Sequence, residues 1–164
     1  MLEAIDAASP DSRIVVPDTL IAPLLVGPTF DPITATLDAL TTAGRLPLIR
    51  SPEPRAALAT WPSRLADARD EELQARNFLE RELIPRLSEA ATELTPSDFV
   101  VDWLYGTLLD GRESGQGTLH VSSGLRNLIG VRLYYGGGVV EELESLAGTT
   151  DELIALLNKV ADSR

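Results

Sequence analysis

The sequence contains no cysteine and only one histidine and one lysine among its 164 residues. The absence of cysteine excludes disulfides, thiolate nucleophiles and cysteine-ligated zinc. The single histidine, His120, excludes histidine-rich metal sites and leaves one candidate base for a histidine-centred triad. Because Lys159 is the only lysine and no G-x-x-x-x-G-K-[ST] motif is present, P-loop chemistry is also excluded.

Aromatic residues make up only 5% of a sequence that is 44% hydrophobic, so the core must consist mainly of Leu, Ile, Val and Ala. The net charge of −11 argues against strong non-specific binding to nucleic acid or to anionic lipid. No basic stretch precedes an apolar run near the N-terminus, and no apolar run approaches the roughly 18 residues that span a bilayer. We therefore expect a cytoplasmic protein without a membrane partner.

The hydrophobic pattern alternates between short β-branched runs and longer helical stripes. It predicts strands at residues 13–16, 45–50, 118–121 and 131–135. It predicts helices at residues 33–43, 51–61, 70–94, 98–109, 139–146 and from 149 onward. Strands that alternate with helices indicate crossovers, and hence an α/β fold with a small, mostly parallel sheet flanked by helices.

Glycine and proline mark the expected boundaries of these elements. Gly44 is placed to end the first helix as a C′ residue. Pro62 is expected to break the helix that begins at Ser51, and Pro85 to kink the long helix at 70–94. Gly136–Gly138 is expected to end the strand at 131–135. We divide the chain into an N-terminal extension (1–12), an α/β domain (13–146) and a C-terminal helix packed on that domain or on a partner (147–164).

Three stretches in order along the chain resemble one known family. They are RIVVPDTLIAPLL, the segment Leu37–Leu58 (LDALTTAGRLPLIRSPEPRAAL) and the segment Ser97–Leu143, which begins with SDFVVDWLYG. Their order resembles the PIN domain, a fold of metal-dependent nucleases that includes VapC-type toxins. The resemblance implies a PIN-like fold, a toxin–antitoxin setting and a site in which about four carboxylates hold Mg²⁺ or Mn²⁺.

Carried over residue by residue, the resemblance places the first acid at Asp18 and the third at Asp98. The position of the second acid is Ala57, and Glu53, one helical turn away, is the candidate substitute metal ligand. The segment that should carry the fourth acid, residues 122–127, contains none. Two carboxylates hold Mg²⁺ poorly, because the ion dehydrates reluctantly and needs compensating charge.

Asp102 is four residues after Asp98 and shares its helix face, so it is the third candidate catalytic acid. Each acid also has a structural reading: Asp18 as a turn residue at a strand end, and Asp98 and Glu53 as first-turn acids favoured by the helix dipole. Asp102 would then face an arginine or solvent. His120 is expected to be a packed or edge residue of its strand rather than a catalyst.

Three hypotheses follow. We favour a PIN-like pseudoenzyme, without a cofactor, that acts through a protein partner or as a homo-oligomer. The second is a divergent ribonuclease with a rebuilt Mg²⁺ or Mn²⁺ site, the only case in which RNA is a partner. The third is an unrelated small α/β interaction or accessory protein. The C-terminal helix carries an apolar face for intramolecular or partner packing, formed by Leu153, Ile154, Leu156, Leu157 and Val160.

Overall fold

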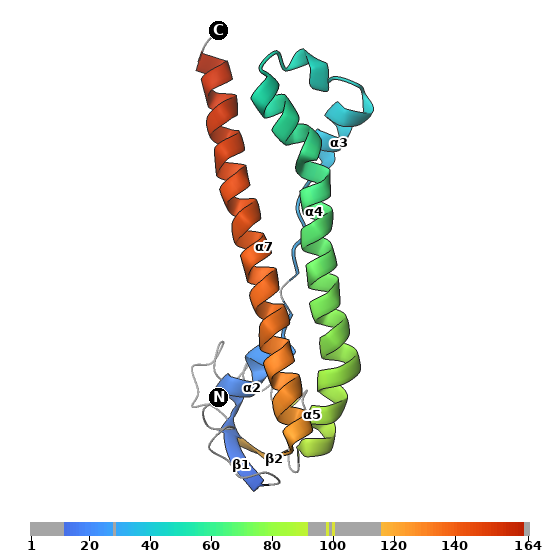
Figure 1. Ribbon diagram of the computed structural model, residues 1–164, viewed down its shortest axis with the longest axis vertical. Helices are drawn as coiled ribbons and strands as arrows, with labels where there is room; N and C mark the ends of the chain where they lie inside the picture. The colour runs from blue at the N-terminus through green and yellow to red at the C-terminus, as the bar shows by residue number, and fades with distance from the viewer. Residues whose placement is uncertain (1–11, 28, 92–97, 99, 101–115, 163–164) are drawn as a thin grey trace. The chain divides into compact units, whose positions relative to one another are not determined.

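The computed structural model describes residues 12–27, 29–91, 98, 100 and 116–162 (Figure 1). Its elements are β1 (Ser12–Pro17), α2 (Asp18–Leu25), α3 (Ala35–Thr42), the 3₁₀ helix η1 (Leu46–Leu48), α4 (Pro52–Phe78), the π-helix η2 (Leu79–Leu83), α5 (Ile84–Ala90), β2 (Gln116–Val121) and α7 (Ser123–Asp162). The chain divides into two compact units. Unit 1 comprises Met1–Pro28 with Leu73–Gly137, and unit 2 comprises Thr29–Glu72 with Gly138–Arg164. Both α4 and α7 contribute residues to each unit.

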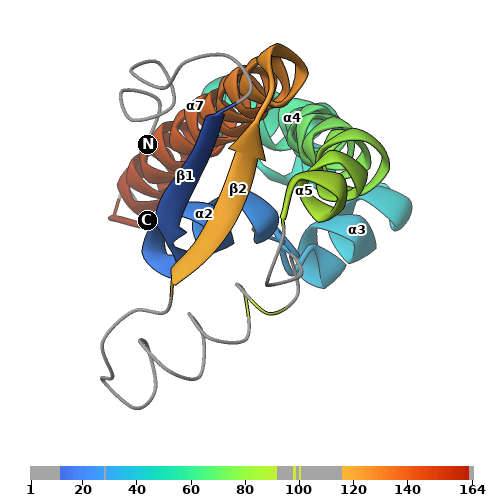
Figure 2. The ribbon, with the colours of Figure 1, turned by 90° about the horizontal axis from the view of Figure 1, so that it is seen from below.

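Among the described residues, the sheet of unit 1 has two strands, and they run antiparallel. β1 pairs with β2 in a register that joins Ser12 to Val121 and Ile14 to Leu119 (Figure 2). The predicted strands at 13–16 and 118–121 are confirmed. The predicted parallel sheet, and with it the PIN-like α/β fold, is wrong, because these two strands pair antiparallel and neither of the other two predicted strands forms: residues 46–48 are the 3₁₀ helix η1, and residues 131–135 lie in α7.

α7 is one continuous helix over residues that the sequence predicts as three separate elements: the strand at 131–135, the helix at 139–146 and the helix from 149. Its buried residues recur every three, four or seven positions, at Leu125, Ile129, Arg132, Val139 and Leu146. This spacing is that of one helix face, so packing selects the helix although the sequence VRLYY favours a strand locally.

The three glycines Gly136–Gly138 lie inside α7 and do not end an element. Each costs a helix about 1 kcal/mol relative to alanine, and the buried residues on either side offset that cost. Thr149 does not cap a new helix, because its hydroxyl donates back to the carbonyl of Ser145 (3.0 Å).

The residues between α3 and α4 form turns. Gly44 has a positive φ of 63°. Its N–H donates to the carbonyl of Thr41, while Arg45 N–H donates to that of Leu40 (3.0 and 2.9 Å). These two bonds make a Schellman motif, so the predicted C′ role of Gly44 is confirmed. The strand predicted at 45–50 is wrong, since Leu48 N–H bonds locally to the carbonyl of Arg45.

α4 runs past Pro62, where we had expected a break, and it bends in its N-terminal half (Figure 1). Leu65 and Ala68 keep this part of the helix packed in unit 2. The helix predicted at 70–94 is confirmed as far as Ala90, and the π-helix η2 directly precedes the turn that contains Pro85. Ahead of it, Ile84 N–H donates to the carbonyl of Leu79, which is a π-helical bond.

The two units differ in the size of their cores. In unit 1, strands and helices enclose a cluster whose fully buried members include Ile21, Leu83, Leu87, Leu119 and Ile129. The core cluster of unit 2 has three buried members, namely Leu65, Ala68 and Leu146, with half-buried Phe30, Trp61 and Leu143 around them.

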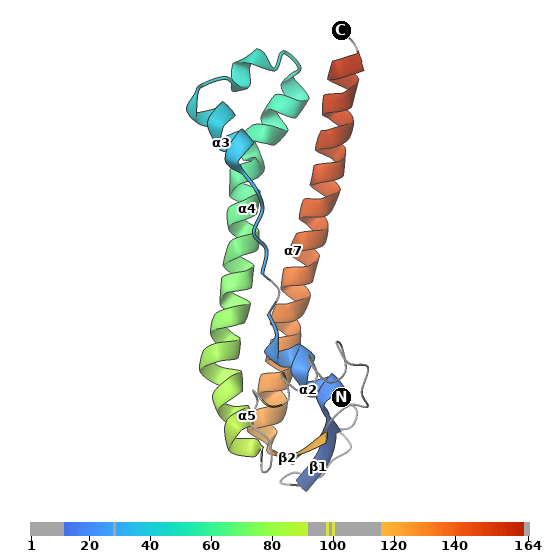
Figure 3. The same cartoon turned by 180° about the vertical axis from the view of Figure 1, so that it is seen from behind.

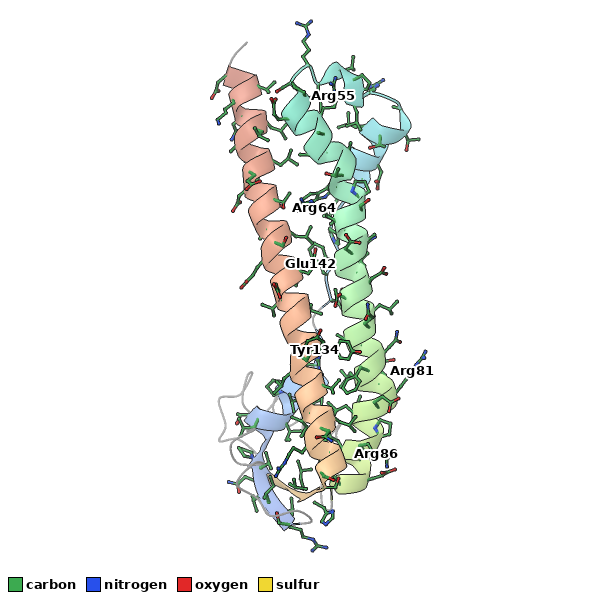
Figure 4. The ribbon with its side chains drawn as sticks, in the orientation of Figure 1. Arg55, Arg64, Arg81, Arg86, Tyr134 and Glu142 are labelled. Atoms are coloured by element: carbon green, nitrogen blue, oxygen red, sulfur yellow. The ribbon has the colours of Figure 1, made fainter. Side chains whose placement is uncertain are left out.

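Unit 2 is also held by polar contacts. Figure 3 shows the segment before α3 running beside α4, where Phe30 N–H donates to Glu72 Oε2 (3.1 Å). Arg64 extends from α4 toward α7 (Figure 4), and its Nη1 donates to Thr149 Oγ1 (3.0 Å). These contacts fix the helices of unit 2 but cover little apolar surface.

Candidate functional site

The predicted acidic residues lie in different parts of the chain. Asp18 is the first residue of α2, directly after β1, and the structure describes its backbone. Asp98 is exposed, and Asp102 lies outside the described residues. Glu53 lies in the first turn of α4 and belongs to unit 2, whereas Asp18 and Asp98 belong to unit 1. The three proposed metal ligands are therefore not brought together within one unit.

In the described part of the chain, no group of three or more His, Asp or Glu residues is placed to hold a metal ion. The catalytic and metal-binding roles of Asp18, Asp98, Asp102 and Glu53 remain predictions. In the same residues, no helix has both the length and the apolar character needed to cross a bilayer.

A large apolar hollow, which we call the unit 2 groove, lies between the turns after α3, the start of α4 and the last turns of α7. Its volume is about 1120 Å³. The apolar lining consists of Leu40, Pro47, Leu48, Ile49, Leu156, Leu157, Val160 and Ala161. Leu48 is 72% exposed, so the groove is open to solvent at η1. The C-terminal apolar face predicted from the sequence thus supplies one wall.

Local chemistry explains why these residues meet. The Schellman motif at Gly44 reverses the chain after α3, and Pro47 fits the second position of η1 because it needs no N–H there. α4 then begins at Pro52, directly after Ser51. Leu48 and Ile49 of this segment line the same groove as Leu156 and Leu157 of α7.

The charged lining of the groove is mainly basic, although the chain as a whole is acidic. It consists of Arg45, Arg50 and Lys159 together with Glu53. Ser51 Oγ donates to Glu53 Oε2 (2.7 Å), and this bond lowers the pKa of Glu53 below its ordinary value. In the described part of the chain, none of the three basic side chains forms an ion pair.

A second, smaller hollow of about 460 Å³ lies in unit 1, where α5 meets the end of β2. His120 and Ser122 line it, as do Arg86 and Glu89. Most of its polar groups are engaged structurally. Arg86 pairs with Glu89 (2.7 Å), and Ser122 Oγ accepts a hydrogen bond from Leu125 N–H (3.1 Å), which caps α7. His120 is half-buried on β2, as the sequence predicted.

Sequence reasoning did not identify the structural role of Arg132. This buried side chain donates from Nε to the carbonyl of Leu24 (2.9 Å) and from Nη2 to that of Val26 (3.2 Å). It thereby satisfies acceptors at the C-terminal end of α2, where a positive charge is favourable. Burial lowers the pKa of Arg132. The sequence signal that could have revealed this buried position is the helical spacing of Arg132 from Leu125 and Ile129.

Comparison with known proteins finds no match among family models, curated proteins or solved structures.

Proposed function

We propose that this protein acts by binding a protein partner through the unit 2 groove. The single observation that carries the proposal is the open apolar lining of that groove, with Leu48 72% exposed. Apolar side chains that stay in water around a hollow favour a role in binding, because leaving them in water costs free energy and a partner that covers them recovers it. The proposal keeps the interaction role expected from the sequence and does not rest on a PIN-like fold.

The modest core of unit 2 supports the same reading. Three buried residues form the centre of its cluster, while Leu48, Ile154 and Leu157 stay exposed. Small folded units have little interior, so they gain much of their stability from a partner that covers apolar surface. A partner in the groove would supply burial that unit 2 lacks.

The test is photo-crosslinking in cells that make the protein naturally. A photoreactive amino acid replaces Leu48 in the groove, and in a control variant it replaces Arg81, which is exposed on η2 of unit 1 and extends away from the helix (Figure 4). We expect one reproducible protein adduct from position 48 that is absent at position 81. Equal adducts at both positions, or none at position 48, would refute the proposal.

A further inference from the structure

We propose that the unit 2 groove binds an acidic amphipathic helix of a partner protein. This inference rests on the proposed function and adds the chemistry of the partner. It follows from the open form of the groove, from its apolar lining and from its local charge.

The open form of the groove favours a peptide segment over a small molecule. Pockets for small ligands have volumes of roughly 300–1,000 Å³ and enclose most of their ligand. The groove measures about 1120 Å³ and is open at Leu48. An open groove of this size suits several side chains presented together by one backbone.

The apolar lining comes from two sides, with η1 contributing Leu48 and α7 contributing Leu156 and Leu157. A helix that carries apolar residues at positions i, i+3, i+4 and i+7 presents them as one stripe, which is the usual mode of helix binding in an apolar groove. That stripe can contact both sides at once.

The charge of the lining selects an acidic helix. Arg45, Arg50 and Lys159 supply three positive charges against the single carboxylate of Glu53. The Ser51 hydroxyl is already bonded to that carboxylate (2.7 Å). Carboxylates on the edges of an incoming helix would pair with the three basic side chains, whereas a basic helix would meet them as like charges.

The same observations disfavour other occupants. A nucleic acid backbone would leave the apolar lining in water, and a flat membrane surface does not fit into a hollow.

The experiment measures binding of two fluorescent synthetic peptides to the full chain by anisotropy. Each peptide has about 18 residues, or five helical turns, with leucine along one stripe. One carries glutamate beside that stripe and the other carries lysine. We expect the glutamate peptide to bind, the lysine peptide to bind at least tenfold more weakly, and the difference to shrink at 1 M salt, where screening acts within about 3 Å.

Variants locate the binding site. We expect Arg50→Glu to weaken binding of the glutamate peptide about tenfold and to strengthen binding of the lysine peptide. Leu48→Ser should weaken binding of both peptides. Arg81→Glu, the same charge change in unit 1, should leave the binding of both unchanged. Circular dichroism establishes that each variant folds. Equal binding of the two peptides, or equal effects of Arg50→Glu and Arg81→Glu, would overturn the inference.

Two further measurements separate this inference from the proposed function. Analytical ultracentrifugation tests for a second copy: a dimer that Arg50→Glu dissociates would overturn the acidic-helix inference. A competition assay tests for nucleic acid: displacement of the peptide by single-stranded RNA would also overturn it. If position 48 crosslinks to a protein but the chain binds both peptides equally, the proposed function stands and only the partner chemistry is refuted. Loss of that crosslink would refute both.

Discussion

Replacing glycine by alanine should have opposite effects on the stability of the protein inside α7 and in the turn after α3. Gly137 lies inside the 40-residue helix α7, and a Cβ built there meets nothing within 4 Å. Gly44 also has open space around it, but its φ is 63°. Since neither site is crowded, the backbone conformation alone decides the effect of alanine.

Gly137→Ala should stabilise the protein by about 1 kcal/mol, which is the helix-interior difference between glycine and alanine. For a chain of 164 residues this corresponds to a rise in Tm of about 2–4 °C. Gly44→Ala should destabilise it by about 1 kcal/mol or more, because a Cβ is strained in the left-handed region.

Thermal unfolding followed by far-ultraviolet circular dichroism measures both effects, with urea unfolding as a second estimate of the free energy. Gly130→Ala is the matched companion, since this residue is also helical with nothing near its Cβ, and it should behave like Gly137→Ala. If Gly137→Ala lowers the stability, residues 136–138 form a loop after a strand and the continuous α7 is wrong.

Three further outcomes are expected. Arg132→Met keeps the apolar stem but removes the donors to Leu24 and Val26, so it should cost about 1–3 kcal/mol in urea unfolding, and Arg132→Lys should not restore both bonds. Leu83→Ala, at a side chain that is fully buried, should cost about 2–5 kcal/mol, whereas Leu73→Ala, at a 52% exposed side chain, should cost far less; equal effects would contradict the assigned core. Ser51→Ala should raise the pKa of Glu53 toward its ordinary value in an NMR titration. Because the folded-state pKa is lowered, the stabilisation from this bond exists above the ordinary pKa and disappears as the pH falls through the folded-state value; an unchanged pKa would show that Ser51 is not its cause.

Local signals predicted several elements correctly. The β-branched run at Ile14–Val16 and the alternating run at Thr118–Val121 are strands, and Gly44 ends α3 through the backbone freedom that the sequence suggested. The helix through Leu79, Leu83 and Leu87 was visible as a stripe of leucines. In these cases the short-range pattern and the tertiary environment favour the same conformation.

The candidate site was only partly visible in the sequence. The apolar face of Leu156, Leu157 and Val160 was identified as a surface for packing, and it lines the unit 2 groove. Glu53 is a candidate metal ligand from the sequence, a role that stays a prediction, and the structure places it in the charged lining of that groove. No local pattern could reveal that Leu48 and Leu157 would line the same groove, because the two are far apart in the chain.

By itself, the sequence determined the composition of the core, the excess of negative charge, the absence of cysteine chemistry and the elements whose local signals are unambiguous. Only the tertiary structure decided that VRLYYGGG is helical, since the preference of β-branched and aromatic residues for strands is weak and the burial of Ile129, Arg132 and Val139 on one face outweighs it. The tertiary structure also decided the antiparallel pairing of β1 with β2 and the assembly of the groove, because both depend on contacts between segments that the sequence separates.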